Sequence, residues 1–284
     1  MKKILFSALA LFSVALTSFA QEAITIKGPN GLLSAVYHKP VNFIEGQKCP
    51  MVILMHGFRS SKEDANLRQI ATSLEQQGVA TLLFDFSAHG QTAAIPENKG
   101  FKFKDLTLKK ELKDAAAIID YAKKLPFVKG IGIVGHSLGG VVGLFSAADY
   151  GKGTIKALML MAPAASLRED ALRGNMLGKT FDPNDPPRSI EFSETESLGR
   201  DFIEEIQKTN ILKTAASYKG DCLILFGKND QIIPYSYGEY LEQVMPNAKY
   251  EQLKGLDHNF GSEDIDKHNK AMEQIVNFMV KKLK

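Results

Sequence analysis

Cysteine is rare in this sequence, with only Cys49 and Cys222 among 284 residues. Each stands just before a short apolar run, at residues 51–55 and 223–226, that we expect to be a buried strand. In the fold expected below, these strands lie three positions apart in one sheet, which is roughly 14 Å at about 4.8 Å per strand. A disulfide requires Cα atoms within about 7 Å of each other. The sequence therefore predicts two free, buried thiols.

A strong charge of either sign is also lacking. The formal net charge is +3 and no basic run occurs away from the two chain ends, which argues against a nucleic-acid partner. No group of histidine, cysteine and aspartate residues has the spacing of metal ligands, so we expect neither a metal site nor a cofactor. Hydrophobic residues at 44% and charged residues at 24% are ordinary for a soluble globular protein.

Long apolar runs are absent except at the start of the chain. Two lysines precede an apolar stretch at residues 4–16, and Ser18 and Ala20 are small residues at the −3 and −1 positions of a cleavage site. This pattern is typical of a secretory signal peptide, and the stretch is shorter than the roughly 20 residues that span a bilayer. We expect residues 1–20 to be removed, which leaves a periplasmic or secreted protein without a membrane anchor.

After this segment, a hairpin is followed by regular alternation of strands and helices. Residues 23–27 and 32–38 alternate in polarity and flank a turn sequence, Gly-Pro-Asn-Gly. The strands expected after the hairpin are residues 51–55, 80–84, 131–134, 157–161, 223–226 and 249–253. The expected helices include residues 66–77, 109–124, 141–150 and 265–282. Because all of these strands except the last are apolar on both faces, we predict an α/β fold with a mostly parallel central sheet and helices on both faces.

One long segment, between Pro163 and Lys213, interrupts this alternation. It contains a stretch rich in proline and aspartate at residues 182–187 and a short helix expected at residues 198–208. An interruption of this length inside a compact domain is more often a functional lid than a plain loop. The predicted organisation is a signal peptide at residues 1–20, a core at residues 21–163 and 213–284, and an inserted lid at residues 164–212.

A serine stands where a strand is expected to turn into a helix. The sequence GHSLG at residues 135–139 follows the strand expected at residues 131–134. In the G-x-S-x-G motif, flanking glycines let strand and helix approach while the serine takes a strained conformation above the sheet. A glycine-rich turn with an incidental serine is the alternative. The strand and helix on either side favour Ser137 as a nucleophile.

A serine hydroxyl needs a base, and in this arrangement the base follows it in the chain. Four of the six histidines precede Ser137, which leaves His258 and His268. His258 lies in the loop between the last strand and the last helix, so it is the predicted base. His268 lies near the start of the helix, where we expect a solvated surface residue.

The acid that orients the base is expected between these two residues in the chain. Asp230 follows the strand at residues 223–226, where its carboxylate can hold the imidazole tautomer. A turn-forming aspartate is the alternative at this position. Asp257 is the other candidate acid, but its adjacency to His258 would point its side chain elsewhere.

An oxyanion hole completes this chemistry. The residues after the strand at 51–55 are His56, Gly57 and Phe58, and we expect the backbone amides of Phe58 and Leu138 to face the developing oxyanion. We expect His56 itself to be structural.

These motifs together resemble the α/β-hydrolase superfamily over residues 21–284. The matching segments are residues 56–58, 85–90, 135–140 and 227–230, together with His258. More narrowly, the chain resembles bacterial cinnamoyl and feruloyl esterases. The segments that carry this second resemblance are residues 120–125, 162–165, 170–175 and 178–183.

The resemblance implies a lid that covers an aromatic acyl group and binds phenolic hydroxyls. The lid aspartate of the family is matched by Asp170, while its lid glutamine and tyrosine are replaced by Leu177 and Phe202. Ala88 replaces a family glycine, and Leu138 stands where these esterases often carry glutamine. These changes make the lid more apolar, and a hydroxyl buried there without a partner costs about 1–3 kcal/mol.

The expected function is a secreted serine esterase, a carboxylic-ester hydrolase that forms an acyl-enzyme. The resemblance implies small aryl or acyl esters of the feruloyl type, plant cell-wall material being one source. Short-chain acyl esters, thioesters, peptides and lipids are the alternatives within catalysis, and a non-catalytic binding protein on the same scaffold is the alternative outside it. The sequence leaves the oligomeric state open, with a homodimer among the options.

Overall fold

The computed structural model describes residues 21–284, so the predicted signal peptide at residues 1–20 lies outside the described part. Eight strands form one sheet in the order β1-β2-β4-β3-β5-β6-β11-β12. Their bounds are β1 Gln21–Gly28, β2 Gly31–His38, β3 Cys49–Met55, β4 Ala80–Phe84, β5 Val128–His136, β6 Ile155–Met161, β11 Asp221–Gly227 and β12 Ala248–Leu253. The β1–β2 and β2–β4 pairs are antiparallel and all the others are parallel, which confirms the predicted fold class.

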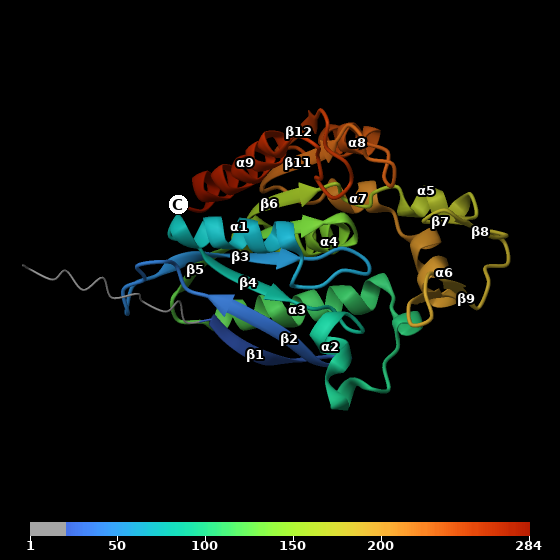
Figure 1. Cartoon of the computed structure of the whole chain (residues 1–284), viewed down its shortest axis with the longest axis horizontal. Helices are drawn as coiled ribbons and strands as arrows, with labels where there is room; N and C mark the ends of the chain where they lie inside the picture. The colour runs from blue at the N-terminus through green and yellow to red at the C-terminus, as the bar shows by residue number, and fades with distance from the viewer. Residues whose placement is uncertain (1–20) are drawn as a thin grey trace, which may run out of the picture.

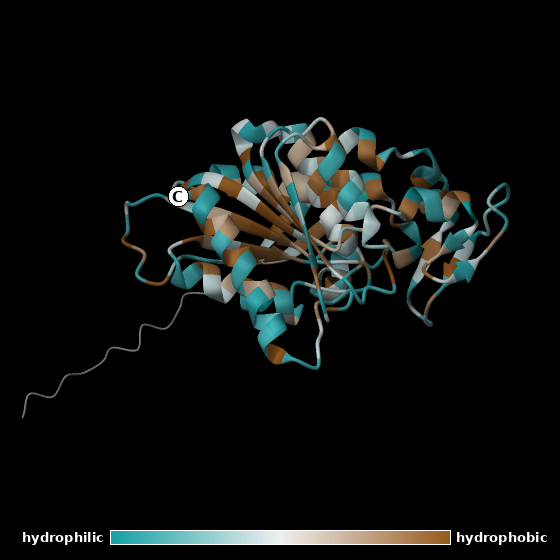
Figure 2. Ribbon diagram, turned by 90° about the horizontal axis from the view of Figure 1, so that it is seen from above, coloured by the Kyte–Doolittle hydropathy of each residue, from teal (hydrophilic) through white to brown (hydrophobic). Residues whose placement is uncertain are grey.

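Helices cover both faces of this sheet (Figure 1). Helices α1 (Ala65–Gln76) and α9 (Ile265–Leu283) pack on one face, and α3 (Leu108–Lys124) and α4 (Ser137–Thr154) pack together on the other. The short helices α7 (Ile211–Ala215) and α8 (Ser236–Val244) extend the second layer toward β11 and β12. Figure 2 shows the resulting core, with brown strands between helices whose outer faces are mainly teal.

Local sequence explains why these helices form where they do. In α1 the buried residues Leu67, Ile70, Ala71 and Leu74 recur at three- and four-residue spacing, so one apolar stripe faces the sheet. Asp64 caps this helix by accepting hydrogen bonds from the amides of its first turn, which otherwise have no helical partner.

The two cysteines are free and buried, as predicted. Cys49 begins β3 and Cys222 lies in β11, and β5 and β6 separate these strands in the sheet. Because β3 and β11 lie three positions apart in the sheet, the two thiols do not meet.

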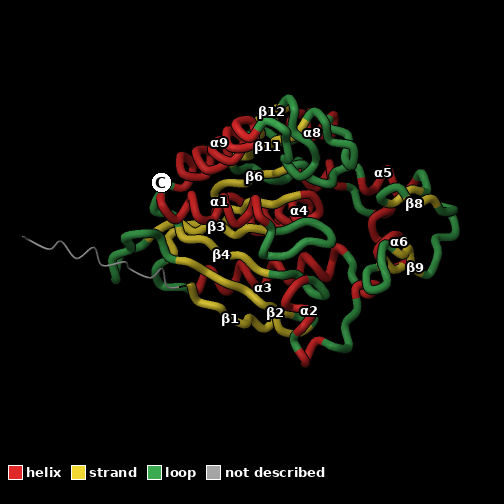
Figure 3. Tube along the Cα trace, in the orientation of Figure 1, coloured by secondary structure: helices red, strands yellow, loops and turns green. Residues whose placement is uncertain are grey.

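The segment at residues 164–212, called the insertion below, lies at the carboxyl ends of the parallel strands (Figures 1 and 3). It contains helix α5 (Leu167–Leu172), two short hairpins and helix α6 (Arg200–Lys208). The hairpin strands are β7 Asn175–Met176, β8 Lys179–Thr180, β9 Ser189–Glu191 and β10 Ser197–Gly199. The helix predicted at residues 198–208 therefore starts two residues too early, because Leu198 pairs with Ile190 in the β9–β10 hairpin.

Within residues 21–284, none of the helices combines the length and the apolar character that crossing a bilayer requires.

Candidate active site

Ser137 occupies the turn between β5 and α4, in the middle of the sheet. Its φ of 52° is in the left-handed region, which is uncommon for any residue other than glycine. The turn is close-packed on both sides. A Cβ at position 139 would lie 2.2 Å from the carbonyl oxygen of His56, and one at position 135 would lie 2.4 Å from that of Gly139. Glycine is therefore required at both ends of the motif.

The structure brings the three predicted triad residues together. The Nε2 atom of His258 lies 3.0 Å from Oγ of Ser137, and its Nδ1 atom lies 2.8 Å from Oδ2 of Asp230. The other carboxylate oxygen of Asp230 accepts hydrogen bonds from the amides of Ile232 at 2.8 Å and Ile233 at 2.9 Å. Both oxygens of this buried carboxylate therefore have partners, and the side chain cannot rotate without breaking them.

His136, inside the G-x-S-x-G motif, links the serine turn to the histidine loop. Its Nε2 atom lies 3.0 Å from the carbonyl oxygen of His258. Burial lowers the pKa of His136, so the ring is neutral at pH 7 and can donate one proton to that carbonyl. The sequence analysis did not assign His136 a role, because the contact joins residues 122 positions apart.

The two rejected candidates lie elsewhere. Asp257 accepts hydrogen bonds from the amides of Asn259 and Gly261, and so forms the turn after His258. The expectation for His268 is wrong, because this residue is half-buried and not simply solvated. Its ring nitrogens lie 3.0 Å from the carbonyl oxygen of Phe260 and 2.9 Å from Oε1 of Gln69, which ties α9 to α1.

The loop that carries Phe58 lies directly against Ser137. A Cβ at Gly57 would be 3.1 Å from Cβ of Ser137, so only glycine allows this approach. His56 is buried, and burial lowers its pKa to about 4. As a neutral ring it donates a hydrogen bond from Nδ1 to the carbonyl oxygen of Gly57 at 2.8 Å, and its Nε2 accepts one from the amide of Phe86 at 3.1 Å. These contacts give His56 a structural role.

A narrow apolar cleft of about 20 Å³ lies beside Ser137. The core contributes Phe58, Ser137, Leu138 and Ile233 to its lining. The insertion contributes Ala164, Leu167, Met176, Leu177, Leu198 and Phe202. Apart from the serine hydroxyl, every lining side chain is apolar, so the cleft favours an apolar group.

Leu177 and Phe202 thus lie where the sequence analysis placed them, but Asp170 does not line this cleft. Its carboxylate accepts a hydrogen bond from the hydroxyl of Ser166 at 2.6 Å. Leu167, Met176, Leu198 and Ile233 were missed, because the first three lie in short elements of the insertion where no sequence pattern separates a cleft residue from a core residue.

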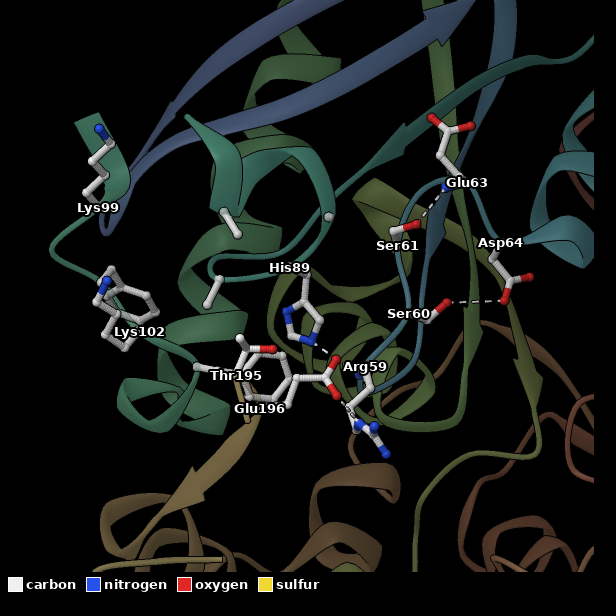
Figure 4. Close-up of a pocket in the computed structure, with 15 residues that line it drawn as sticks. Arg59, Ser60, Ser61, Glu63, Asp64, His89, Lys99, Lys102, Thr195 and Glu196 are labelled. Atoms are coloured by element: carbon white, nitrogen blue, oxygen red, sulfur yellow. Dashed lines mark hydrogen bonds and ion pairs between the residues drawn. The ribbon is translucent and has the colours of Figure 1, made fainter. Parts of the chain in front are cut away.

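A second, polar cleft of about 600 Å³ lies beyond Phe58 (Figure 4). Its lining includes Arg59, His89, Lys99, Lys102 and Glu196. Phe103, also in this lining, packs edge-on against Phe58 with 5.2 Å between ring centroids. The Phe58 side chain therefore borders the apolar cleft on one side and contacts the wall of the polar cleft on the other.

Within residues 21–284, no three histidine, cysteine, aspartate or glutamate side chains come together as a metal site would require.

Comparisons with known proteins identify the fold family. The family model described as alpha/beta hydrolase fold matches residues 50–181. Est1E from Butyrivibrio proteoclasticus, in a structure with ferulic acid bound, is 30% identical with a TM-score of 0.82, over 92% of this chain and 99% of that one. A second Est1E structure gives 29% identity and a TM-score of 0.79, over 92% and 98% of the two chains.

A more distant match is the esterase domain of a Rhodothermus marinus protein, at 19% identity and a TM-score of 0.66, over 93% of this chain and 99% of that one. At this identity the likeness shows the fold alone. No curated protein matches the chain. The similarity to Est1E extends over nearly the full length of both chains and includes the insertion, so the resemblance inferred from the sequence is confirmed. The chain belongs to the α/β-hydrolase family.

Proposed function

We propose that this protein is a secreted serine esterase that hydrolyses carboxylic esters through an acyl-enzyme. One observation carries the proposal, the hydrogen-bonded series from Ser137 through His258 to Asp230 at the edge of an apolar cleft. A nucleophile, a base and an acid that orients the base are the parts that acyl transfer requires.

In the proposed mechanism, Oγ of Ser137 attacks the ester carbonyl while Nε2 of His258 takes its proton. The carboxylate of Asp230 stabilises the imidazolium that forms, and the amides of Phe58 and Leu138 donate to the oxyanion. His258 then returns the proton to the leaving alcohol, and the acyl group remains on Ser137. A water molecule activated by His258 releases the acid in the second half of the reaction.

The acyl group is proposed to occupy the apolar cleft. Its apolar lining suits the ring of a hydroxycinnamoyl group or a similar small aryl or alkyl acyl group. The ferulic acid bound to Est1E supports an aromatic acyl group by similarity. The cleft offers a ring hydroxyl no polar side chain except Ser137, so fewer hydroxyls on the ring should give faster turnover.

A screen of the purified mature protein tests this assignment. Methyl cinnamate, p-coumarate, ferulate and caffeate should be compared with straight-chain p-nitrophenyl esters. We expect hydrolysis of the aryl esters, with kcat/KM falling about 5- to 100-fold for a ring hydroxyl that enters the apolar cleft. A strong preference for straight acyl chains over every cinnamate would overturn the aromatic part of the proposal.

The serine mechanism has its own test. Ser137→Ala should abolish hydrolysis and labelling by a fluorophosphonate probe, while circular dichroism shows an intact fold. Ser217→Ala removes an exposed hydroxyl that bonds only to the carbonyl of Thr214, and should behave as the wild type. Retained hydrolysis in the Ser137 variant would refute the mechanism.

Secretion is proposed from the pattern at residues 1–20 alone. Expression of the full chain in a bacterium, followed by N-terminal sequencing of the periplasmic fraction, should find a protein that begins at Gln21. An uncleaved protein in the cytoplasm would contradict this localisation.

A further inference from the structure

The turn between β9 and β10 contacts two consecutive residues of the loop after β3. Phe192 of the turn packs edge-on against the ring of Phe58, with 5.5 Å between centroids. Glu196, at the other end of the turn, accepts a hydrogen bond from Nε of Arg59 at 2.5 Å. The guanidinium of Arg59 also lies over the Phe192 ring, 5.8 Å from its centroid. The insertion therefore holds the segment that carries the proposed oxyanion donor.

The turn itself is fixed by internal hydrogen bonds. The amides of Phe192 and Ser193 both donate to the carbonyl oxygen of Glu196, at 2.9 and 3.2 Å. The hydroxyl of Ser193 donates to the Glu196 carboxylate at 3.2 Å, so this carboxylate is oriented before it meets Arg59. A carboxylate held in this way can restrain its partner.

Arg59 needs such a restraint because its backbone is strained. Its φ is 60°, in the left-handed region that disfavours side chains with a Cβ. The amide of Arg59 donates to Nε2 of His89 at 3.4 Å, a long hydrogen bond. Burial lowers the pKa of His89 to about 3, so the ring is neutral and can accept it. Figure 4 shows Glu196 and His89 beside Arg59 at this point.

We propose that Glu196 is a positioning residue for the oxyanion hole and acts through Arg59. The Glu196–Arg59 ion pair and the Phe192–Phe58 contact together hold the peptide between Phe58 and Arg59 in its strained conformation. This conformation keeps the Phe58 amide directed at the carbonyl bound to Ser137. The inference rests on the proposed function, because it concerns the same oxyanion.

Loss of this restraint should lower kcat and leave KM nearly unchanged. Oxyanion donors act mainly on the transition state, and removal of one typically lowers turnover about 10²–10³-fold. Glu196→Ala would make the orientation of the Phe58 amide less fixed without removing the amide, so we expect a smaller loss in kcat, about 5- to 30-fold. The ion pair is partly exposed, so its contribution to global stability is small and the melting temperature should change little.

The main alternative is that Glu196 and Arg59 touch the substrate, because both line the polar cleft. Methyl and p-nitrophenyl esters of the same acid separate these roles. A positioning residue affects both esters by the same factor in kcat/KM, whereas a residue in contact with the alcohol affects them differently.

The test compares five variants with the wild type, namely Glu196→Ala, Glu196→Gln, Arg59→Ala, the double variant of Arg59→Ala with Glu196→Ala, and Glu194→Ala. Glu196→Ala should lose kcat as above, and Glu196→Gln, which keeps an acceptor for Nε, should restore most of it. In an Arg59→Ala background, Glu196→Ala should have no further effect, because the partner is already gone. Glu194→Ala is the matched control, since within residues 21–284 the exposed Glu194 has no ion pair or side-chain hydrogen bond.

Three results would overturn the proposal. They are a kcat for Glu196→Ala within twofold of the wild type, a loss that differs more than threefold between the two esters, and full additivity with Arg59→Ala. If the alanine variant does not fold, the wild type and Glu196→Gln are compared at low and high salt, because salt screens the Glu196–Arg59 ion pair but not the neutral glutamine contact. The wild type should lose kcat at high salt more than Glu196→Gln does, and an equal salt dependence contradicts the proposal. Wild-type hydrolysis and its loss in Ser137→Ala are measured first, so a failure of the proposed function is recognised separately.

Discussion

Replacing Asp230 with asparagine changes the charge of the side chain while keeping its shape. In the wild type, one carboxylate oxygen accepts two backbone amides, from Ile232 and Ile233, and the other accepts Nδ1–H of His258. The side-chain carbonyl oxygen of an asparagine must occupy the position that accepts the amides of Ile232 and Ile233, because an NH₂ group there would face two donors. The NH₂ group must then point at His258.

This orientation imposes the wrong tautomer on the base. The new NH₂ group donates to Nδ1 of His258, so the ring proton moves to Nε2, which can no longer take the proton of Ser137. Reversing the amide would leave two buried N–H groups unpaired, at about 1–3 kcal/mol each. A total of about 3 kcal/mol leaves roughly one molecule in 150 with the active tautomer. With the loss of the charge that stabilises the imidazolium, kcat/KM should fall about 10³–10⁴-fold.

The assay is hydrolysis of p-nitrophenyl acetate at pH 7 to 8, with thermal unfolding as a check on the fold. Asp257→Asn is the matched control, because Asp257 accepts two turn amides and makes no contact with the His258 ring. It should retain activity within about threefold. Activity of Asp230→Asn within tenfold of the wild type, or a larger loss in the Asp257 variant, would refute the reasoning.

Two further predictions concern stability. Leu177 has a φ of 51° in the two-residue turn before Gly178, so Leu177→Asn should stabilise the fold by about 1 kcal/mol in urea unfolding and lower kcat/KM for apolar acyl groups. Burial raises the pKa of Asp114 to about 6 from an ordinary 3.8. The contribution of protonated Asp114 to the free energy of unfolding is therefore full below pH 4 and is lost as the pH rises through 6. That loss is about 3 kcal/mol, and Asp114→Asn should flatten the dependence of unfolding free energy on pH over this range.

The sequence was sufficient for the features that depend on local pattern and on chain order. The strand predicted at residues 80–84 is β4 residue for residue, because four of its five residues are apolar and the strand is buried on both faces. Asp230 and His258 could be chosen because each follows a parallel strand, and the carboxyl ends of such strands meet at one edge of the sheet. Their roles in catalysis remain predictions.

The contacts that could not be predicted join residues far apart in the chain. Arg59 and Glu196 are 137 positions apart, and His268 and Gln69 are 199 positions apart. The hairpins of the insertion have strands of two or three residues, too short for any alternation to show. For the same reason Leu198 was placed in a helix, although it pairs with Ile190.

The left-handed residues are a further case. Ala88 replaces a glycine of the resembling family, yet its φ is 60°. The sequence showed the substitution but not whether the backbone had changed to accommodate it. The structure places Ala88 in the left-handed region, so tertiary contacts hold the loop against the steric preference of alanine.

Phe58 joins the two properties that the insertion is proposed to control. Its ring lines the apolar cleft, its edge contacts Phe192 of the β9–β10 turn, and its amide is the proposed oxyanion donor. An acyl group bound in the cleft would therefore contact Phe58, the residue whose amide must keep its orientation in the transition state. Binding energy from the acyl group can then act on kcat and not only on KM, because the occupied cleft and the Glu196–Arg59 pair restrain one loop from its two sides. We therefore propose that the insertion contributes to the chemical step as well as covering the site, so changes in its β9–β10 hairpin should alter kcat.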